Sequence, residues 1–157
     1  MRIGLGYDVH RLAEGVPRGL GGVRIPHFQG LAGWSDADVL THAVMDALLG
    51  AAALGDIGKH FPPGDPELKG ISSLVLLERV GVILGEAGYK VGNIDATIVA
   101  ERPKIAPHVE SMRAALSGAL GCSPGDIGIQ ATTSEKLGFI GREEGMAAWA
   151  VAAIEKI

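Results

Sequence analysis

The 157-residue sequence has few aromatic residues, a single cysteine and no cluster of basic residues. Aromatic side chains make up only 4% of the chain whereas 24 residues are glycine, so the core has to be built mainly from small aliphatic side chains on closely approaching backbones. Cys122 has no second cysteine to pair with, which excludes an internal disulfide and suits a reducing compartment.

Charge and hydropathy argue against nucleic-acid-binding and membrane proteins. The 14 lysine and arginine residues are outnumbered by 18 acidic ones, and the net charge of -4 argues against a nucleic-acid partner. No apolar run approaches the roughly 18 residues of a membrane span, and the N-terminus lacks a signal-peptide pattern. We expect a cytoplasmic protein without a membrane partner, folded as a single domain over residues 1–157.

Three common motifs of nucleotide-binding and hydrolytic enzymes are missing. The sequence contains no GxxxxGK[ST], no GxGxxG after a predicted strand and no GxSxG. A P-loop enzyme, a dinucleotide-binding fold and a serine hydrolase therefore lose support.

Hydrophobic periodicity predicts a mixture of strands and helices. The predicted strands cover residues 1–12, 93–101 and 126–135, and the predicted helices cover residues 35–55, 72–87 and 107–120. The first helix would begin at a Ser35 cap and end at Gly55. Residues 15–33 predict one or two short strands with turns, and residues 56–70 a long loop of the kind that often carries function. This β-α-α-β-α-β order predicts an α/β or α+β layer of helices on one sheet.

The C-terminal residues 144–157 allow two predictions. Their alanines favour a helix, whereas an apolar character on both faces would suit a strand buried within a sheet. Propensity alone predicts the helix.

A candidate metal site begins in the first predicted strand. Asp8 and His10 share one face there, opposite apolar residues assigned to the core: Ile3, Leu5, Tyr7 and Val9. Their Cα atoms would lie about 6.5 Å apart, so both side chains can reach one ion. His42 supplies a third ligand, and Asp46, one helical turn further, could orient it. One carboxylate and two imidazoles leave an open position on tetrahedral zinc. The alternative is a solvated strand face and an ordinary helical histidine.

Residues 131–145, which follow the third predicted strand, concentrate hydroxyl groups, charges and glycines. Hydroxyls and backbone N–H groups at a strand end bind phosphate oxygens, Arg142 offers a bidentate fork, and Glu135 could hold a hard divalent ion. DIGKHFPP and ERPK add weaker phosphate-binding candidates. The alternative is a glycine-rich turn with ordinary polar side chains.

Taken together, five segments resemble the 2-C-methyl-D-erythritol 2,4-cyclodiphosphate synthase family of the non-mevalonate isoprenoid pathway, essentially from end to end. They are GYDVHRL, GGVRIP, SDADVLTHAVMDALLGAAALGDIGKHFP, AERPK and TTSEKLGFIGREEG, in this order. The resemblance implies an α+β fold with a β-α-β-α-β-β sheet covered by helices on one face, and it makes residues 144–157 a strand. It also implies a homotrimer with active sites between subunits and a core that could take an isoprenoid diphosphate.

The resemblance further implies roles for individual residues. Asp8, His10 and His42 would bind Zn²⁺, and Glu135 would help to hold a second divalent cation, Mg²⁺ or Mn²⁺. Thr133 would stabilise the transition state, beside Trp34 in the catalytic site. The cytidine diphosphate part would contact Ala100, Glu101, Arg102, Pro103, Lys104, Ile105, Ala106, Thr132, Ser134, Phe139 and Arg142. The rest of the substrate would contact Asp56, Ile57, Gly58, Phe61, Pro62, Pro63, Gly64 and Asp65, with Ser35 as a further substrate-binding residue.

In this family the 2-phosphate of 4-diphosphocytidyl-2-C-methyl-D-erythritol 2-phosphate attacks the β-phosphate of the same molecule, which closes a cyclic diphosphate and releases CMP. Positioning and charge stabilisation would supply most of the catalysis.

The chain departs from the family pattern at two places. Trp34 stands where the family usually has histidine, and an indole cannot take over the acid, base or acceptor roles of an imidazole. Pro63 and Gly64 stand where FPDTDP is common. Two alternatives therefore stay open: a metal-dependent phosphodiesterase using zinc-bound water, and a non-catalytic trimer that binds nucleotide or isoprenoid.

Overall fold

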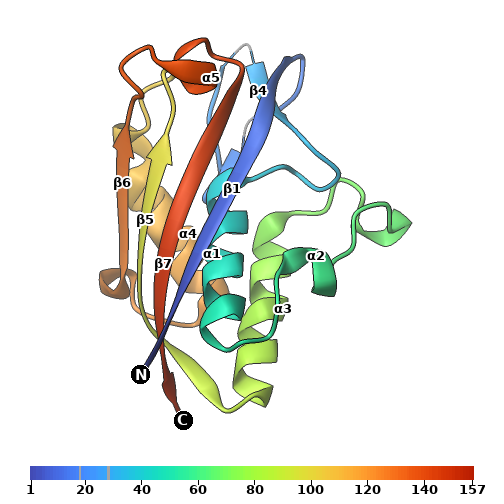
Figure 1. Ribbon diagram of the computed structural model, residues 1–157, viewed down its shortest axis with the longest axis vertical. Helices are drawn as coiled ribbons and strands as arrows, with labels where there is room; N and C mark the ends of the chain where they lie inside the picture. Colours follow the sequence, from blue (N-terminus) through green and yellow to red (C-terminus); the bar gives the residue numbers. More distant parts are fainter. Residues whose placement is uncertain (18, 28) are drawn as a thin grey trace.

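A five-stranded sheet and three longer helices form the two layers of the computed structural model, which describes residues 1–17, 19–27 and 29–157 (Figure 1). The sheet contains β1 (Arg2–Glu14), β4 (Gln29–Ala32), β5 (Tyr89–Val99), β6 (Ile127–Thr132) and β7 (Gly145–Lys156), in the spatial order β4-β1-β7-β5-β6. Strands β5 and β6 are parallel, and the other neighbours are antiparallel. A separate hairpin pairs β2 (Gly19–Leu20) with β3 (Val23–Arg24).

The three longer helices lie behind the sheet in the view of Figure 1 and leave its front uncovered. They are α1 (Val39–Ala51), α3 (Ser73–Glu86) and α4 (Val109–Leu120), and the short elements are α2 (Ile57–His60), α5 (Gly138–Gly141) and the 3-10 turns η1 (Pro66–Leu68), η2 (Ala106–His108) and η3 (Pro124–Asp126). This mixed sheet flanked by helices confirms the predicted α+β class. Among the described helices, none is long and apolar enough to cross a membrane.

The prediction for the two faces of β1 is wrong. Gly4 and Gly6 face α1 and are buried, whereas four apolar residues are exposed: Ile3, Leu5, Tyr7 and Val9. The reason is the close approach of α1, whose backbone oxygens would lie about 2 Å from a Cβ atom at either glycine. Asp8 and His10 continue the glycine face, so they point toward α1 and not toward solvent.

Replacing Gly6 by alanine is expected to destabilise the protein strongly. A Cβ atom there would lie 1.9 Å from the Ala43 carbonyl oxygen, so β1 and α1 would have to separate. Overpacking of this kind costs about 1–3 kcal/mol or more. Thermal unfolding should show a clear fall in Tm for Gly6→Ala. Gly118→Ala is the matched control, because its Cβ meets nothing within 4 Å and alanine favours the helix; an equal Tm for both variants would contradict the packing argument.

The first helix begins at Asp38 and not at Ser35. The Asp38 carboxylate accepts from the Thr41 N–H at 3.1 Å and from the N–H groups of Gly21 and Gly22 at 2.9 and 2.8 Å. One buried carboxylate therefore caps α1 and fastens the turn between β2 and β3. The predicted end at Gly55 is also wrong, since α1 stops at Ala51.

The C-terminal segment forms strand β7, which confirms the strand that the resemblance implies, and the helix predicted from propensity alone is wrong. Because β7 pairs with β1 on one side and β5 on the other, nearly all of its backbone groups find partners within the sheet. The other predicted helices and strands correspond to α3, α4, β1, β5 and β6 with shifted ends. Residues 15–33 were predicted to form one or two short strands, and the structure has three there. The segment 56–70 was predicted to be a loop, and it contains α2 and η1.

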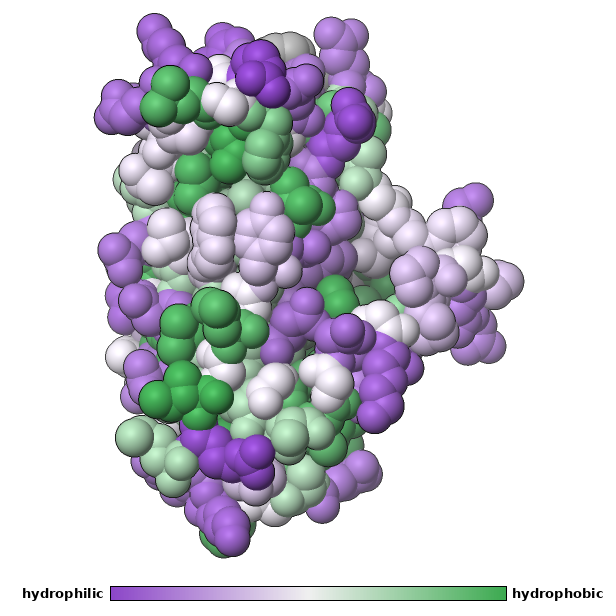
Figure 2. Space-filling model, in the orientation of Figure 1, coloured by the Kyte–Doolittle hydropathy of each residue, from purple (hydrophilic) through white to green (hydrophobic). Residues whose placement is uncertain are grey.

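The uncovered front of the sheet carries an apolar surface, which we call the open sheet face. It consists of Ile3, Leu5, Tyr7, Val9, Trp149 and Val151, all exposed in the single chain. Leu5 pairs with Val151 and Tyr7 with Trp149 across the two strands, and the rings of the second pair have centroids 4.9 Å apart. Figure 2 shows this side of the molecule, where hydrophobic and neutral side chains gather over the strands.

Candidate metal and phosphate site

Asp8, His10 and His42 come together where β1 passes α1. Asp8 Oδ2 lies 2.9 Å from His10 Nε2 and 3.1 Å from His42 Nδ1, and these two nitrogens are 3.2 Å apart. One ligand atom from each residue thus falls within 4.8 Å of the others. The close approach of β1 to α1 creates this convergence, because Asp8 and His10 continue the face of Gly4 and Gly6.

The orientation of His10 is set by strand β4. Its Nδ1 lies 3.0 Å from the carbonyl oxygen of Ala32. Because a carbonyl can only accept, Nδ1 carries a hydrogen, so in the neutral ring the lone pair lies on Nε2 and points toward Asp8 and His42. A backbone carbonyl that fixes the tautomer in this way is a common support for a metal ligand. Two imidazole nitrogens and a carboxylate oxygen are a donor set that fits zinc.

Burial and the attraction between opposite charges shift the pKa values of Asp8 and His10 in the metal-free chain. Burial alone would raise the pKa of Asp8, but hydrogen bonds and charge from His10 and His42 outweigh it and hold that pKa below its usual value. Burial alone would lower the pKa of His10, but the hydrogen bond and charge of Asp8 raise it. The cluster therefore attracts a positive charge, which a proton or a metal ion can supply.

A cavity of about 250 Å³ opens beside the three residues. Besides them it is lined by six residues predicted for the site, Trp34, Ser35, Ile57, Gly58, Phe61 and Pro63, and by Leu68 and Leu76, which the sequence analysis missed. Its far wall comes from the segment 57–68, which the sequence showed only as a loop. Apolar side chains thus face the polar cluster across a space suited to a small ligand.

Asp46 and Asp56 shape the cavity from behind. Asp46 accepts from the N–H of Ile57 at 2.8 Å, so its hydrogen-bond partner among the described residues is α2 and not the histidine that it was predicted to orient. Burial raises the pKa of Asp46. Asp56 caps α2 by accepting from the Lys59 N–H at 2.9 Å. Asp46 therefore ties α2 to α1, and Asp56 stabilises the first turn of α2.

Trp34 connects the cavity to the segment 61–70. Its indole N–H donates to the carbonyl oxygen of Asp65 at 2.9 Å, and the Lys69 ammonium lies 5.8 Å from the ring centroid. The Asp65 carboxylate accepts from the N–H of Glu67 at 3.0 Å. The indole therefore walls the cavity and holds the segment that closes it. Predicted residues Pro62 and Gly64 do not line the cavity.

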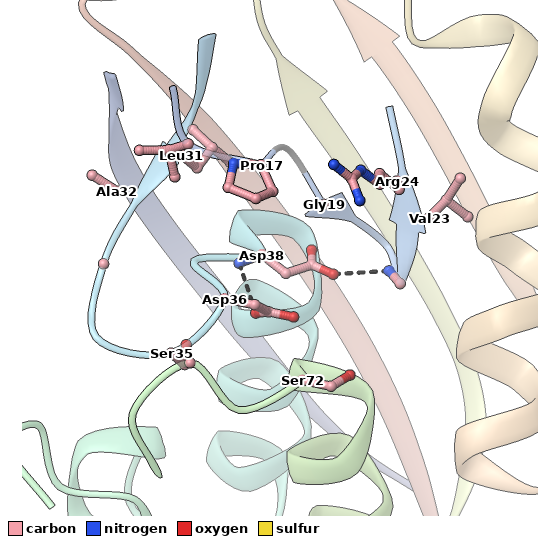
Figure 3. Close-up of a pocket in the computed structure, with 14 residues that line it drawn as sticks. Pro17, Gly19, Val23, Arg24, Leu31, Ala32, Ser35, Asp36, Asp38 and Ser72 are labelled. Carbon is pink, nitrogen blue, oxygen red and sulfur yellow. Dashed lines mark hydrogen bonds between the residues drawn. The ribbon is translucent and has the colours of Figure 1, made fainter. Parts of the chain in front are cut away.

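A larger cavity of about 520 Å³ lies on the other side of Ser35 (Figure 3). Figure 3 shows the carboxylates of Asp36 and Asp38 within it, above Ser72 at the start of α3. Both carboxylates accept hydrogen bonds from N–H groups of the chain itself. The cavity lies outside the cluster of Asp8, His10 and His42.

The second group of predicted residues gathers at the carboxyl ends of β5 and β6. These strands are parallel neighbours, so residues 100–106 and 132–135 meet at one edge, where the Ala100 N–H donates to the Thr132 carbonyl at 3.0 Å. One Glu101 oxygen accepts from the N–H groups of Ser134 and Lys136 at 3.2 and 2.9 Å. Glu101 thereby shapes the segment that presents the hydroxyl groups.

Thr133, Glu135 and Arg142 are exposed at the same end of the molecule. Thr133 Oγ1 accepts from the N–H of Glu135 at 3.2 Å, and Arg142 forms an ion pair with Glu144 at 3.0 Å. Phe139 lies nearer to the metal ligands, since it lines a shallow cavity of about 270 Å³ together with His10. In the sheet, β7 separates β1 from β5, so a single chain presents its phosphate-binding candidates as two half-sites.

The predicted residue Ser35 stands behind His42 together with Ser73 and Asp36, which were not predicted. His42 Nε2 lies 2.9 Å from Ser73 Oγ and 3.1 Å from Ser35 Oγ, and Ser73 in turn contacts Asp36. The sequence offered no signal for Ser73, because it follows Ser72 at a helix start and either serine could have been the cap.

Comparisons with known proteins place this geometry in context. The chain matches the model of the YgbB family over residues 1–155. A 2-C-methyl-D-erythritol 2,4-cyclodiphosphate synthase from Dehalococcoides mccartyi is 65% identical over 99% of both chains. The bifunctional IspDF of Campylobacter jejuni has a TM-score of 0.96 and 40% identity over 99% of this chain, which spans 42% of that longer one. IspF of Plasmodium falciparum, solved as a CDP complex, has a TM-score of 0.86 and 30% identity over 99% of this chain and 96% of its own.

Proposed function

The chain belongs to the YgbB family, and on this premise we propose that Asp8, His10 and His42 hold a zinc ion beside the reacting phosphates. The chain is an enzyme of the lyase class that performs the cyclisation step of isoprenoid precursor biosynthesis. It converts 4-diphosphocytidyl-2-C-methyl-D-erythritol 2-phosphate into 2-C-methyl-D-erythritol 2,4-cyclodiphosphate and CMP. We place the reaction in the cytoplasm, where Cys122 would stay reduced.

The observation that carries the metal role is the convergence of three ligand atoms with the lone pair of His10 directed among them. A bound divalent cation supplies positive charge that offsets the repulsion between two phosphates and stabilises the charge of the transition state. The chain supplies the rest by positioning. Ile57, Phe61 and Leu76 exclude water from the cavity, and Ile57 and Gly58 begin a helix whose position Asp46 fixes.

The cytidine diphosphate part would be held by the second half-site. The hydroxyl groups of Thr132, Thr133 and Ser134 and the guanidinium of Arg142 can donate to phosphate oxygens, with Thr133 nearest to the transition-state charge. Residues 100–106 would form the cytosine pocket. A cytidine nucleotide as part of the ligand is supported by the Plasmodium falciparum neighbour, which was solved as a CDP complex. Glu135 would hold a second divalent cation, Mg²⁺ or Mn²⁺, at the diphosphate.

We further propose that the two half-sites meet in a homotrimer, each active site being shared by two copies. The open sheet face supports this assembly, because a contiguous exposed apolar surface marks an interface. Three copies joined through this face would enclose an apolar core, which could take an isoprenoid diphosphate.

The proposed chemistry is tested by ³¹P NMR of the purified protein with its substrate and Mg²⁺, before and after chelation. We expect CMP and two coupled cyclic-diphosphate resonances, both lost on chelation. Monophosphate products without a cyclic compound would indicate the phosphodiesterase alternative. CMP binding without any turnover would indicate the non-catalytic alternative.

Trp34→Phe should raise the KM for the substrate about 2- to 10-fold, the worth of one hydrogen bond, with little change in kcat. Phenylalanine keeps a ring beneath Lys69 but cannot donate to the Asp65 carbonyl, so the segment 61–70 closes less well. Steady-state kinetics give both constants. A loss of kcat at unchanged KM would show instead that the indole contacts the reacting phosphates.

A further inference from the structure

The face of His42 that points away from the metal ligands is enclosed by hydroxyl groups. Its Nε2 lies 2.9 Å from Ser73 Oγ and 3.1 Å from Ser35 Oγ. Ser73 is fully buried and His42 is 7% exposed, so water competes little for these contacts. A contact buried to this degree is able to hold the imidazole ring in one orientation.

The direction of these hydrogen bonds follows from Asp36. The Asp36 carboxylate accepts from the Ser73 N–H at 2.9 Å and from the Asp38 N–H at 3.2 Å, and it also accepts the Ser73 hydroxyl hydrogen. A serine has only one hydroxyl hydrogen, so Ser73 can offer His42 nothing but a lone pair. The hydrogen between His42 and Ser73 therefore sits on His42 Nε2, and the lone pair of the ring sits on Nδ1.

From this geometry we infer that Ser73 and Asp36 are positioning residues, which hold His42 with its Nδ1 lone pair directed at the metal position. The inference rests on the proposed metal site and extends it to residues that touch neither metal nor substrate. His10 is held in the matching way by the Ala32 carbonyl. With both rings locked, two lone pairs and the Asp8 carboxylate converge on one point, an arrangement that is repulsive without a cation.

The arrangement also links the metal site to α3. Ser73 is the first residue of α3, and Asp36 accepts from its N–H as well as from its hydroxyl. The position of His42 therefore depends on how α3 begins. The metal site is supported by three elements: β4 through Ala32, α3 through Ser73, and the loop before α1 through Asp36.

Ser73→Ala is the direct test, because it removes the hydroxyl without adding volume. Zinc affinity, measured by competition with a chromophoric chelator, should fall about 10- to 100-fold, as expected for loss of a group that supports a metal ligand. The visible spectrum of the Co²⁺-loaded protein should shift, since the orientation of His42 changes. Ser117→Ala is the matched control, because Ser117 is also buried and its hydroxyl donates to the Ala114 carbonyl within α4.

Histidine ¹H–¹⁵N spectra of the metal-free protein provide a readout that does not need the metal. The Nε2 hydrogen of His42 should be protected from exchange in the wild type and in Ser117→Ala, and unprotected in Ser73→Ala. If the wild type shows this protection but binds no zinc, the proposed metal site fails while the positioning of His42 stands. The inference is overturned if Ser73→Ala keeps the wild-type zinc affinity and Co²⁺ spectrum, or if Ser35→Ala alone removes the protection.

Discussion

Asp8→Asn is expected to reduce turnover about 10²- to 10³-fold and to release most of the bound zinc. Asparagine has nearly the same shape as aspartate, but it lacks the negative charge that lies 2.9 and 3.1 Å from the nitrogens of His10 and His42. The chain should still fold and assemble, because Asp8 is only partly buried and, among the described residues, its contacts are to the side chains of His10 and His42. Metal content by atomic absorption and turnover by ³¹P NMR measure the two effects.

A control variant and chelation of the wild type separate the effect of zinc loss from other effects of Asp8→Asn. Glu86→Gln makes the same change of charge at the other end of α3, about 20 Å from Ser73, and it should leave zinc and turnover unchanged. Chelation of the wild type should reproduce the Asp8→Asn defect, and added zinc should reverse it in the wild type only. An aggregated Asp8→Asn protein would show that the residue belongs to the core. If Asp8→Asn loses its zinc but keeps full turnover, zinc is not needed for the reaction and that part of the proposal is wrong.

Leu5→Glu is expected to dissociate the proposed trimer and to abolish most of the activity. Leu5 is 68% exposed in the single chain, so glutamate there should leave the fold of one copy intact. In an assembly built on the open sheet face, the same glutamate would be buried without a partner, which costs several kcal/mol in each copy. Activity should fall with assembly because the two half-sites of a single chain remain apart.

Sedimentation velocity would follow the mass, and circular dichroism would verify the fold. Val82→Glu is the matched control, since Val82 is 61% exposed on α3, away from the open sheet face. We expect that control to keep the wild-type mass and turnover. A Leu5→Glu protein with unchanged mass would show that the copies join through another surface. A monomer with full turnover would show that one chain holds a complete active site.

Much of the site could be predicted because its residues lie in short segments of distinctive composition. Asp8 and His10 are two positions apart in one strand, which guarantees that they share a face, and the order of five motifs identified the family. His42 was a candidate ligand from its place on the first predicted helix, but no spacing rule relates a helix to a strand 30 residues before it. The roles of His42 and of the segment 57–63 therefore came from the resemblance. Ser73 could not be predicted as part of the site, because its hydrogen-bond partner Asp36 lies 37 positions away in the sequence.

The sequence by itself determined a mixture of helices on one sheet, the chemical character of the ligands and the family, and the family in turn implied the α+β class. These properties depend on local periodicity and on residue types, which a sequence displays directly. Only the tertiary structure decided which face of β1 is buried, because alternation alone is equally consistent with either face and the contact between α1 and the glycines selects one. It also confirmed the strand that the resemblance implies for residues 144–157, because pairing of β7 on both sides outweighs the helical propensity of alanine. The hydrogen positions on His10 and His42 follow from Ala32 and Ser73, neighbours that exist only once the chain has folded.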